Sequence, residues 1–182
     1  IGVGFSRVGN FDKIAMVKMD LNGNIDATFG QNGLLTFPFG SGHARASSII
    51  QQPDGKYLVA GWARYVNKDE YVIIRLLQNG SLDSSFGTNG LAKGVFSNSS
   101  FAEDEIAQIA LLSDNKIIIA GRSYNGQDDD GFVACFDTDG TINQSFGTNG
   151  LVIVKFDVIP PYESVRALAI DNSDNIYLGG DV

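Results

Sequence analysis

The sequence predicts an all-β fold, a β-propeller built from four-stranded antiparallel blades, with three repeats of 57 to 60 residues in this chain. Phe29-Gly30-Gln31-Asn32-Gly33 recurs as Phe86–Gly90 and as Phe146–Gly150, which sets the period of the repeat. Between these motifs, short runs rich in Val, Ile, Tyr and Phe alternate with turn residues, and no helical period is found. The whole chain, residues 1–182, is therefore expected to be one propeller-type repeat region.

Each repeat contains four apolar runs in the same order, and several are apolar on both faces, which favours burial between two neighbouring blades. The expected blade limits are residues 1–33 for a partial blade with its linker, 34–90 and 91–150 for two blades, and 151–182 for a partial blade without its last strand. The first strand is predicted at Leu34–Phe39, Leu91–Phe96 and Leu151–Phe156; the second at Ala46–Gln52, Ile106–Leu112 and Val165–Asp171; the third at Gly2–Ser6, Lys56–Ala63, Lys116–Arg122 and Asn175–Gly180; the fourth at Lys13–Asp20, Tyr71–Leu77 and Phe132–Asp137.

The connections carry turn chemistry. Asn22-Gly23, Asn79-Gly80 and Asp139-Gly140 end the fourth strand of each repeat, and both members of such dipeptides tolerate positive φ. A linker of nearly uniform sequence follows and ends in the Phe-Gly-x-Asn-Gly motif. We expect its Phe to fill the gap between neighbouring blades, and its Gly to let the chain turn from the outer strand of one blade to the inner strand of the next.

The pattern from Pro53 to Gly90 resembles the delta-60 repeat, a bacterial propeller-type repeat. It reads D-G-K, then an apolar run with Ala60-Gly61, then Arg75-Leu76, then N-G-S-L-D, S-F-G and N-G. The other copies match more loosely: Cys135, for example, stands at the place of Arg75. The resemblance covers nearly the whole chain and implies the fold, but it implies little chemistry, because the biochemical function of that family is poorly defined.

Composition disfavours several classes of protein. The formal net charge of −8 would repel a phosphate backbone, so no nucleic-acid partner is expected. No apolar run approaches the roughly 20 residues that a membrane-spanning helix needs, so no membrane insertion is expected. The single cysteine, Cys135, lies in an apolar run and is expected to be buried as a small hydrophobic residue.

The loops after the first and the third strand of each repeat differ between copies, whereas the other connections hardly change. In an up-down meander these two loops lie at the same end of the sheet, so we expect any specific partner there. Aromatic side chains at this end can stack on a sugar or anchor a protein, or can simply pack as half-buried residues. The candidate ligand-binding residues are Trp62, Tyr65, Tyr124 and Tyr162.

Two acidic clusters occur in the corresponding loops of one repeat and are expected to approach each other. Converging carboxylates suit calcium, which takes about 6–8 oxygen ligands. The alternative is a solvated acidic rim, and no other cofactor is expected. The candidate calcium ligands are Glu103, Asp104, Glu105, Asp128, Asp129 and Asp130.

No motif for a catalytic nucleophile accompanies the single histidine, His43, so no catalytic residue is assigned. The expected function is a non-catalytic binding or scaffold module of a bacterial repeat protein that presents a propeller face to a protein or glycan. One alternative is a hydrolase or lyase in the central channel, where the expected inner strand supplies Thr36, Lys93 and Lys155. The other is a purely structural spacer array.

Three periods are fewer than the four to eight blades with which propellers typically close. The chain is therefore expected either to belong to a longer repeat protein or to form a homodimer that completes a six-bladed ring by strand exchange. The acidic charge, the low cysteine content and the resemblance favour an extracellular or cell-surface location.

Overall fold

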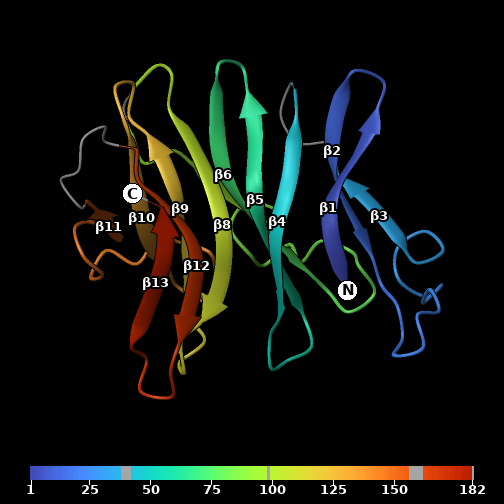
Figure 1. Ribbon diagram of the computed structural model, residues 1–182. Coiled ribbons are helices and arrows are strands. Elements are labelled where there is room, and N and C mark those ends of the chain that lie inside the picture. The colour runs from blue at the N-terminus through green and yellow to red at the C-terminus, as the bar shows by residue number, and fades with distance from the viewer. Residues whose placement is uncertain (38–41, 98, 156–161, 182) are drawn as a thin grey trace.

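The computed structural model describes residues 1–37, 42–97, 99–155 and 162–181, in which every regular element is a β-strand (Figure 1). The all-β prediction is confirmed for these residues, and none of them belongs to a helix that could cross a membrane. Phe39 and Phe156, where two of the predicted strands end, lie outside the described residues. The strands are β1 (Gly2–Val8), β2 (Phe11–Val17), β3 (Leu34–Phe37), β4 (Ala44–Gln51), β5 (Tyr57–Tyr65), β6 (Lys68–Leu76), β7 (Leu91–Gly94), β8 (Glu103–Leu111), β9 (Ile117–Tyr124), β10 (Asp129–Phe136), β11 (Leu151–Val154), β12 (Ser164–Ile170) and β13 (Ile176–Asp181).

The strands form three sheets in the order of the chain. The N-terminal sheet has the order β1-β2-β3, and the C-terminal hairpin is β12-β13. An eight-stranded sheet lies between them, but its two halves are joined only by one parallel pair, Asp69 with Glu103. It therefore divides into two antiparallel sets, which we call the first set (β4-β5-β6-β7) and the second set (β8-β9-β10-β11).

Each Phe-Gly-x-Asn-Gly linker joins two paired strands, which corrects the expected path of the chain. The linker at Phe86–Gly90 leads from β6 into β7. These strands pair antiparallel, with Ile74 opposite Leu91 and Tyr71 opposite Gly94. β3 pairs with β2, and β11 with β10, in the same way. The strand grouping expected from the sequence, with limits at residues 33, 90 and 150, is thus shifted by one strand, because the linker folds the chain back beside the strand it has just left.

Three residues of the linker adopt positive φ, which explains why its sequence hardly varies. In the second copy they are Gly87, Asn89 and Gly90, with φ of 50°, 54° and 92°. The corresponding residues of the other two copies also have positive φ. Only Gly, and less readily Asn, adopts this backbone region without strain, so the turn dictates the motif.

We call β4, β8 and β12 the inner strands, because β4 lies against β8 and β8 against β12. β3, β7 and β11 lie at the opposite edges of their sheets. Side chain to backbone hydrogen bonds connect the inner strands: the Ile109 amide donates to Ser48 Oγ at 3.4 Å, and the Leu168 amide to Gln108 Oε1 at 2.7 Å. The second predicted strand of each repeat, rather than the first, is therefore the inner one.

The hydrophobic core lies between successive sheets. Leu58 and Ile73 of the first set pack in one cluster with Ile106 and Phe132 of the second set. Phe86 is fully buried in this cluster, so it fills the gap between neighbouring sheets as the sequence predicts. Cys135 is also buried, as expected, and burial raises the pKa of its thiol to about 11.

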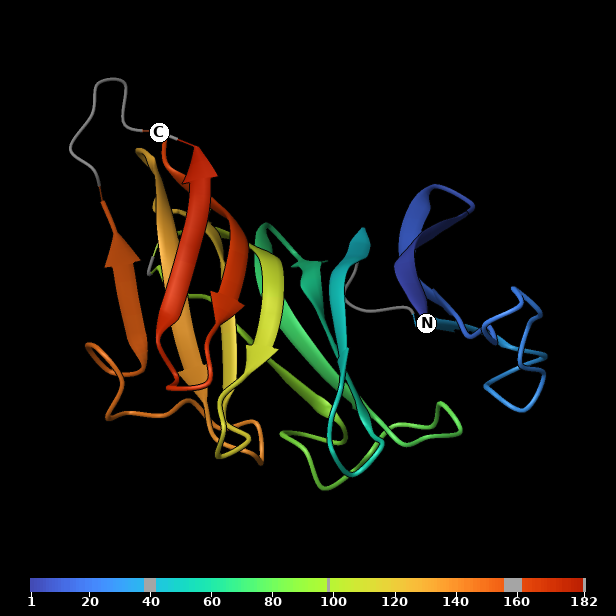
Figure 2. The same cartoon turned by 60° about the horizontal axis from the view of Figure 1, so that its bottom comes forward.

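The N-terminal sheet and the C-terminal hairpin lie at opposite ends of the molecule in both views (Figures 1 and 2). Both ends expose large apolar side chains, among them Phe5 (49% exposed) and Tyr177 (56%). The residue that corresponds to Tyr177 in the first set, Leu58, is fully buried. Within the described residues the sheets form an open row rather than a closed ring.

Candidate functional site

A β-bulge recurs at the same place on all three inner strands. The register shifts between Ala46 and Ser48, between Ile106 and Gln108, and between Val165 and Ala167. The extra residues are Ser47, Ala107 and Arg166. A bulge re-aims the side chains around it, and bulges are frequent next to binding sites.

Each bulge explains one glycine of the repeat. The carbonyl oxygen of Arg45 lies 2.0 Å from the position that a Cβ on Gly61 would occupy. In the same way, the carbonyl oxygen of Glu105 lies 2.0 Å from the Cβ position of Gly121, and that of Ser164 lies 1.9 Å from the Cβ position of Gly180. No side chain fits opposite the bulge, so the glycine that ends each recurring Ala-Gly or Gly-Gly pair is a requirement of the fold.

Residues around the three bulges line one cavity of about 210 Å³ that spans the first set, the second set and the C-terminal hairpin. We call it the bulge crevice. Three arginines, one glutamate and one tryptophan are among the residues of its wall. It is lined by Arg45, Ser47, Trp62, Glu105, Ile106, Ala107, Arg122, Ser164, Val165 and Arg166.

Arg45 is held in place by a buried carboxylate of the N-terminal sheet. Its Nε and Nη2 donate to Asp12 Oδ2 at 2.9 and 2.6 Å, and the Asp12 side chain has no exposed surface. Hydrogen bonds from Arg7 and Arg45 lower the pKa of Asp12 to about 2. The guanidinium also lies over the Phe5 ring at 4.2 Å and 5.9 Å from the Trp62 ring. Arg45 is thus a fixed wall of the crevice.

The two acidic clusters do approach each other, but an arginine lies between them. Arg122 contacts Glu105 at 3.1 Å, Asp129 at 2.6 Å and Glu103 at 3.8 Å. The strand pairing causes this, because Arg122 lies opposite Glu105 on one neighbour of β9 and opposite Gly131 on the other. The guanidinium occupies the place between carboxylates where a cation would have to sit.

The remaining members of the acidic clusters are bound separately. Asp104 is fully buried and accepts a hydrogen bond from the Phe96 amide at 2.6 Å. Asp130 is buried and forms an ion pair with Lys155 at 2.9 Å, and Asp128 accepts from the Asn125 amide group. No three acidic, histidine or cysteine side chains of the described residues gather as a metal-binding group.

The four predicted aromatic residues do not form one surface. Trp62 lines the bulge crevice. Tyr65, three residues further along β5, lies on the opposite face, because its neighbours there belong to the core shared with the N-terminal sheet. Its ring is 3.7 Å from Lys93 Nζ. Tyr124 and the exposed Tyr162 both pair with Asp129, outside the crevice.

The strand that was expected to line a central channel lies elsewhere. Thr36 and Lys93 are on β3 and β7, at the sheet edges opposite the inner strands. Lys93 pairs with Glu70 at 2.7 Å, and Lys155, directly after β11, pairs with Asp130. These residues therefore do not converge, and the sequence-based reason for an enzymatic site is removed.

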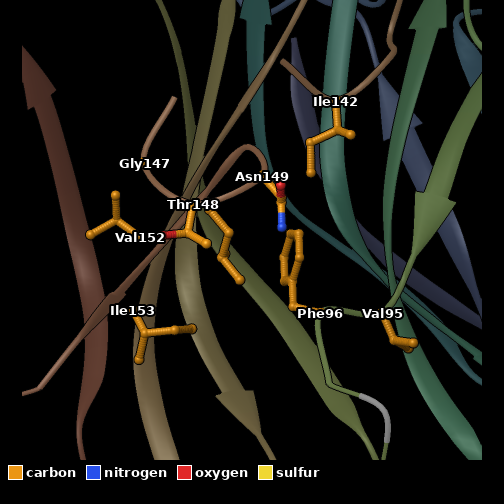
Figure 3. A pocket seen from close by; sticks show the side chains of 9 residues that line it. Val95, Phe96, Ile142, Gly147, Thr148, Asn149, Val152 and Ile153 are labelled. Atoms are coloured by element: carbon orange, nitrogen blue, oxygen red, sulfur yellow. The ribbon is translucent and has the colours of Figure 1, made fainter. Parts of the chain in front are cut away.

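A larger groove of about 640 Å³ lies between the third linker, which contributes Gly147, Thr148 and Asn149, and strand β11 (Figure 3). Phe96 and Val95 form one side of it, and Val152 and Ile153 of β11 lie opposite. An equivalent groove of about 630 Å³ lies one repeat earlier, lined by Leu91 and neighbouring residues. Because the groove recurs with the linker and is mostly apolar, it is a consequence of the repeat geometry and offers little chemistry for recognition.

Sequence reasoning missed the arginines of the crevice, although the repeat contains a signal for them. When the copies are aligned on Gly61, Gly121 and Gly180, the residues around the glycines differ at every crevice position. Trp62, Arg122 and Asp181 occupy one such position, and Ser47, Ala107 and Arg166 another. Residues that differ between copies while the glycines and turns around them stay the same are side chains that the fold does not require.

Two segments of the chain, residues 52–86 and 112–146, match a family model described as "Domain of unknown function (DUF5122) beta-propeller". Each segment runs from the turn before the third predicted strand to the Phe of the linker. The match supports a propeller-type repeat and assigns no activity. No curated protein matches the chain.

Proposed function

We propose that the chain is a non-catalytic binding module of a propeller-type repeat protein and that the bulge crevice is its binding site. The observation that carries this proposal is the crevice itself. Three copies of one backbone feature, each with its obligatory glycine, present different side chains into one cavity. A purely structural role would require the glycines and bulges but would leave no reason for three arginines and a tryptophan to line the same space.

The partner class that we propose is a glycan or a protein. Tryptophan and arginine are the residues that most often dominate binding energy at interfaces. Trp62 and Arg45 lie together at one side of the crevice, and Arg122 lies opposite the next bulge. The location that we propose is extracellular or at the surface of a bacterium.

The finer architecture is part of the proposal. Four-stranded blades of the delta-60 type, arranged around an axis next to the inner strands, are supported by the first and second sets and by the matched segments. The apolar side chains exposed at the two ends support the proposal that further repeats pack against them. These repeats would come either from a longer chain or from a second copy. Light scattering of this chain distinguishes the two: a mass of twice 19.5 kDa indicates the dimer and a monomer indicates the longer chain.

A glycan and protein array tests the binding function. We expect the wild type to bind a subset of the array and Trp62→Ala with Arg166→Gln to lose that binding. Lys93→Gln is the control, because it also removes one positive charge but lies at the far edge of the sheet. Turnover of an ester or glycoside panel, or binding that persists in the crevice variant, would contradict the proposal.

A further inference from the structure

Two arginines of the bulge crevice keep hydrogen-bond donors that the protein does not use. Arg45 binds Asp12 through Nε and Nη2, and Arg166 binds Asp181 through Nε alone. Among the described residues, nothing accepts a hydrogen bond from Nη1 of Arg45 or from either Nη of Arg166. A guanidinium presents such donors in a planar fork that matches a carboxylate.

The charges around the crevice favour an anion in spite of the net charge of −8. Its wall contains Arg45, Arg122 and Arg166 but only one carboxylate, Glu105, which already pairs with Arg122. Asp12, which neutralises Arg45, is fully buried behind it. The carboxylate of Asp181 is 64% exposed and competes for Arg166 from the rim. The interior of the crevice thus offers cationic donors to a ligand.

The other side chains of the wall suit a sugar better than a peptide. Trp62 provides a partly exposed aromatic ring, and Ser164 and Glu105 add a hydroxyl and a carboxylate that can bind sugar hydroxyl groups. The volume of about 210 Å³ is below the roughly 300–1,000 Å³ of pockets for drug-sized ligands, which limits the occupant to about one ring. A peptide side chain of similar size would leave the tryptophan and the hydroxyl groups without a function.

We propose that the bulge crevice binds a uronic acid residue of an acidic polysaccharide. The free Nη donors of Arg45 and Arg166 take the carboxylate, and the sugar ring lies against Trp62. The inference rests on the proposed binding function and names its ligand class. It requires no metal and no covalent step.

Isothermal titration calorimetry with trigalacturonic acid as the probe tests this inference on the 182-residue chain. We expect the affinity for the acid to fall as the salt concentration rises. The affinity for the fully methyl-esterified trisaccharide, which lacks the negative charges, should be at least tenfold lower. Arg166→Gln should weaken binding of the acid at least tenfold. Arg166 is 68% exposed and forms an ion pair with the exposed Asp181 at the rim, so this variant should fold normally. Lys93→Gln should bind like the wild type.

The outcomes separate the ligand class from the function. Equal affinity for the acid and its methyl ester, or unchanged binding by Arg166→Gln, overturns the uronic acid inference. Binding of a neutral glycan or of a polyglutamate peptide that is lost in Trp62→Ala also overturns it, but leaves the proposed binding module standing. If no glycan or protein of the array binds at all, both proposals fall.

Discussion

The carbonyl oxygen of Arg45 stands 2.0 Å from the position of a Cβ on Gly61, so the bulge on β4 and the glycine on β5 depend on each other. Gly61→Ala should lower the free energy of unfolding by at least about 1–3 kcal/mol, the usual effect of forcing extra atoms into a packed site. Gly4 is the same position of the repeat on β1, which pairs with β2 without a register shift, and no described residue lies within 4 Å of its Cβ position. Gly4→Ala is therefore the matched control, and urea unfolding of both variants measures the difference. Equal effects would show that the bulge is not the cause.

A second prediction concerns the buried ion pair between Arg75 and Asp83, whose atoms Nε and Oδ2 are 2.8 Å apart. Burial would raise the pKa of Asp83, but hydrogen bonds from Ser85 and Lys56 and the charge of Arg75 hold it well below its usual range. Arg75→Cys should lower the free energy of unfolding by about 1.5–3 kcal/mol, because the buried Asp83 loses its ion pair with Arg75 and keeps the one with Lys56.

The third repeat provides the rescue for that variant. Cys135 stands at the place of Arg75 and Asn143 at the place of Asp83, and the Asn143 side chain binds Ser145 as Asp83 binds Ser85. The double variant Arg75→Cys, Asp83→Asn should recover at least about 1 kcal/mol relative to Arg75→Cys, as expected for coupled neighbours. Purely additive losses in a double-mutant cycle would refute the coupling.

Asp104 should make stability depend on pH. Burial raises its pKa to about 6, against hydrogen bonds from Ser123 and the Phe96 amide, whereas its ordinary value is 3.8. Between these values the folded protein binds the proton that the unfolded chain has lost, so the free energy of unfolding falls as the pH rises from about 4 to about 6.

Asp104→Asn removes this dependence and retains an oxygen for the Phe96 amide. The variant should therefore exceed the wild type in stability by about 1–3 kcal/mol at pH 7, and the difference should shrink towards pH 4. Urea unfolding at pH 4.5, 5.5 and 7 measures it. Glu103→Gln makes the same chemical change on a neighbouring, partly exposed side chain and should leave the pH profile of the wild type unchanged. If the free energy of unfolding of Asp104→Asn changed with pH in the same way as that of the wild type, Asp104 would not be the cause of the dependence.

The linker turn yields a prediction about backbone conformation. Asn89 has a φ of 54°, a region that costs an L-residue other than Asn or Asp about 1–2 kcal/mol. Asn89→Ala should destabilise the protein by about 1 kcal/mol, whereas Asn89→Gly should be nearly neutral because Gly adopts positive φ readily. Thermal unfolding of the pair decides between a conformational role and a role of the amide side chain, which would make both variants equally unstable.

Local sequence was sufficient for the strands, the turns and the burial of Phe86 and Cys135. It was not sufficient for the choice of partner strand. The linker was expected to carry the chain into the next blade, but β6 and β7 pair with each other. An apolar run contains no information on which edge it will pair with, since pairing depends on the geometry of the turn and on the sheets packed against it.

The candidate site was predicted only in part, for the same reason. Trp62 was recognised, but it shares its site with Arg45 and Arg166 rather than with Tyr65, from which a sheet separates it. The two acidic clusters were correctly expected to meet, yet Arg122 between Glu105 and Asp129 was not foreseen. Such contacts join side chains of different strands, so they cannot be read from the sequence until the strand register is known.

The sequence by itself determined the period of the repeat, the all-β class and the positions of the turns, because Gly, Asn and Phe at fixed spacing act through local conformation and burial. The tertiary structure decided which strand is the inner one, which residues the bulges bring together and which charged side chains form ion pairs. Those features depend on pairing between strands and packing between sheets, and a change of one residue in register exchanges every side chain between the two faces. The bulge crevice exists only at that level, since strands from three different repeats contribute its wall.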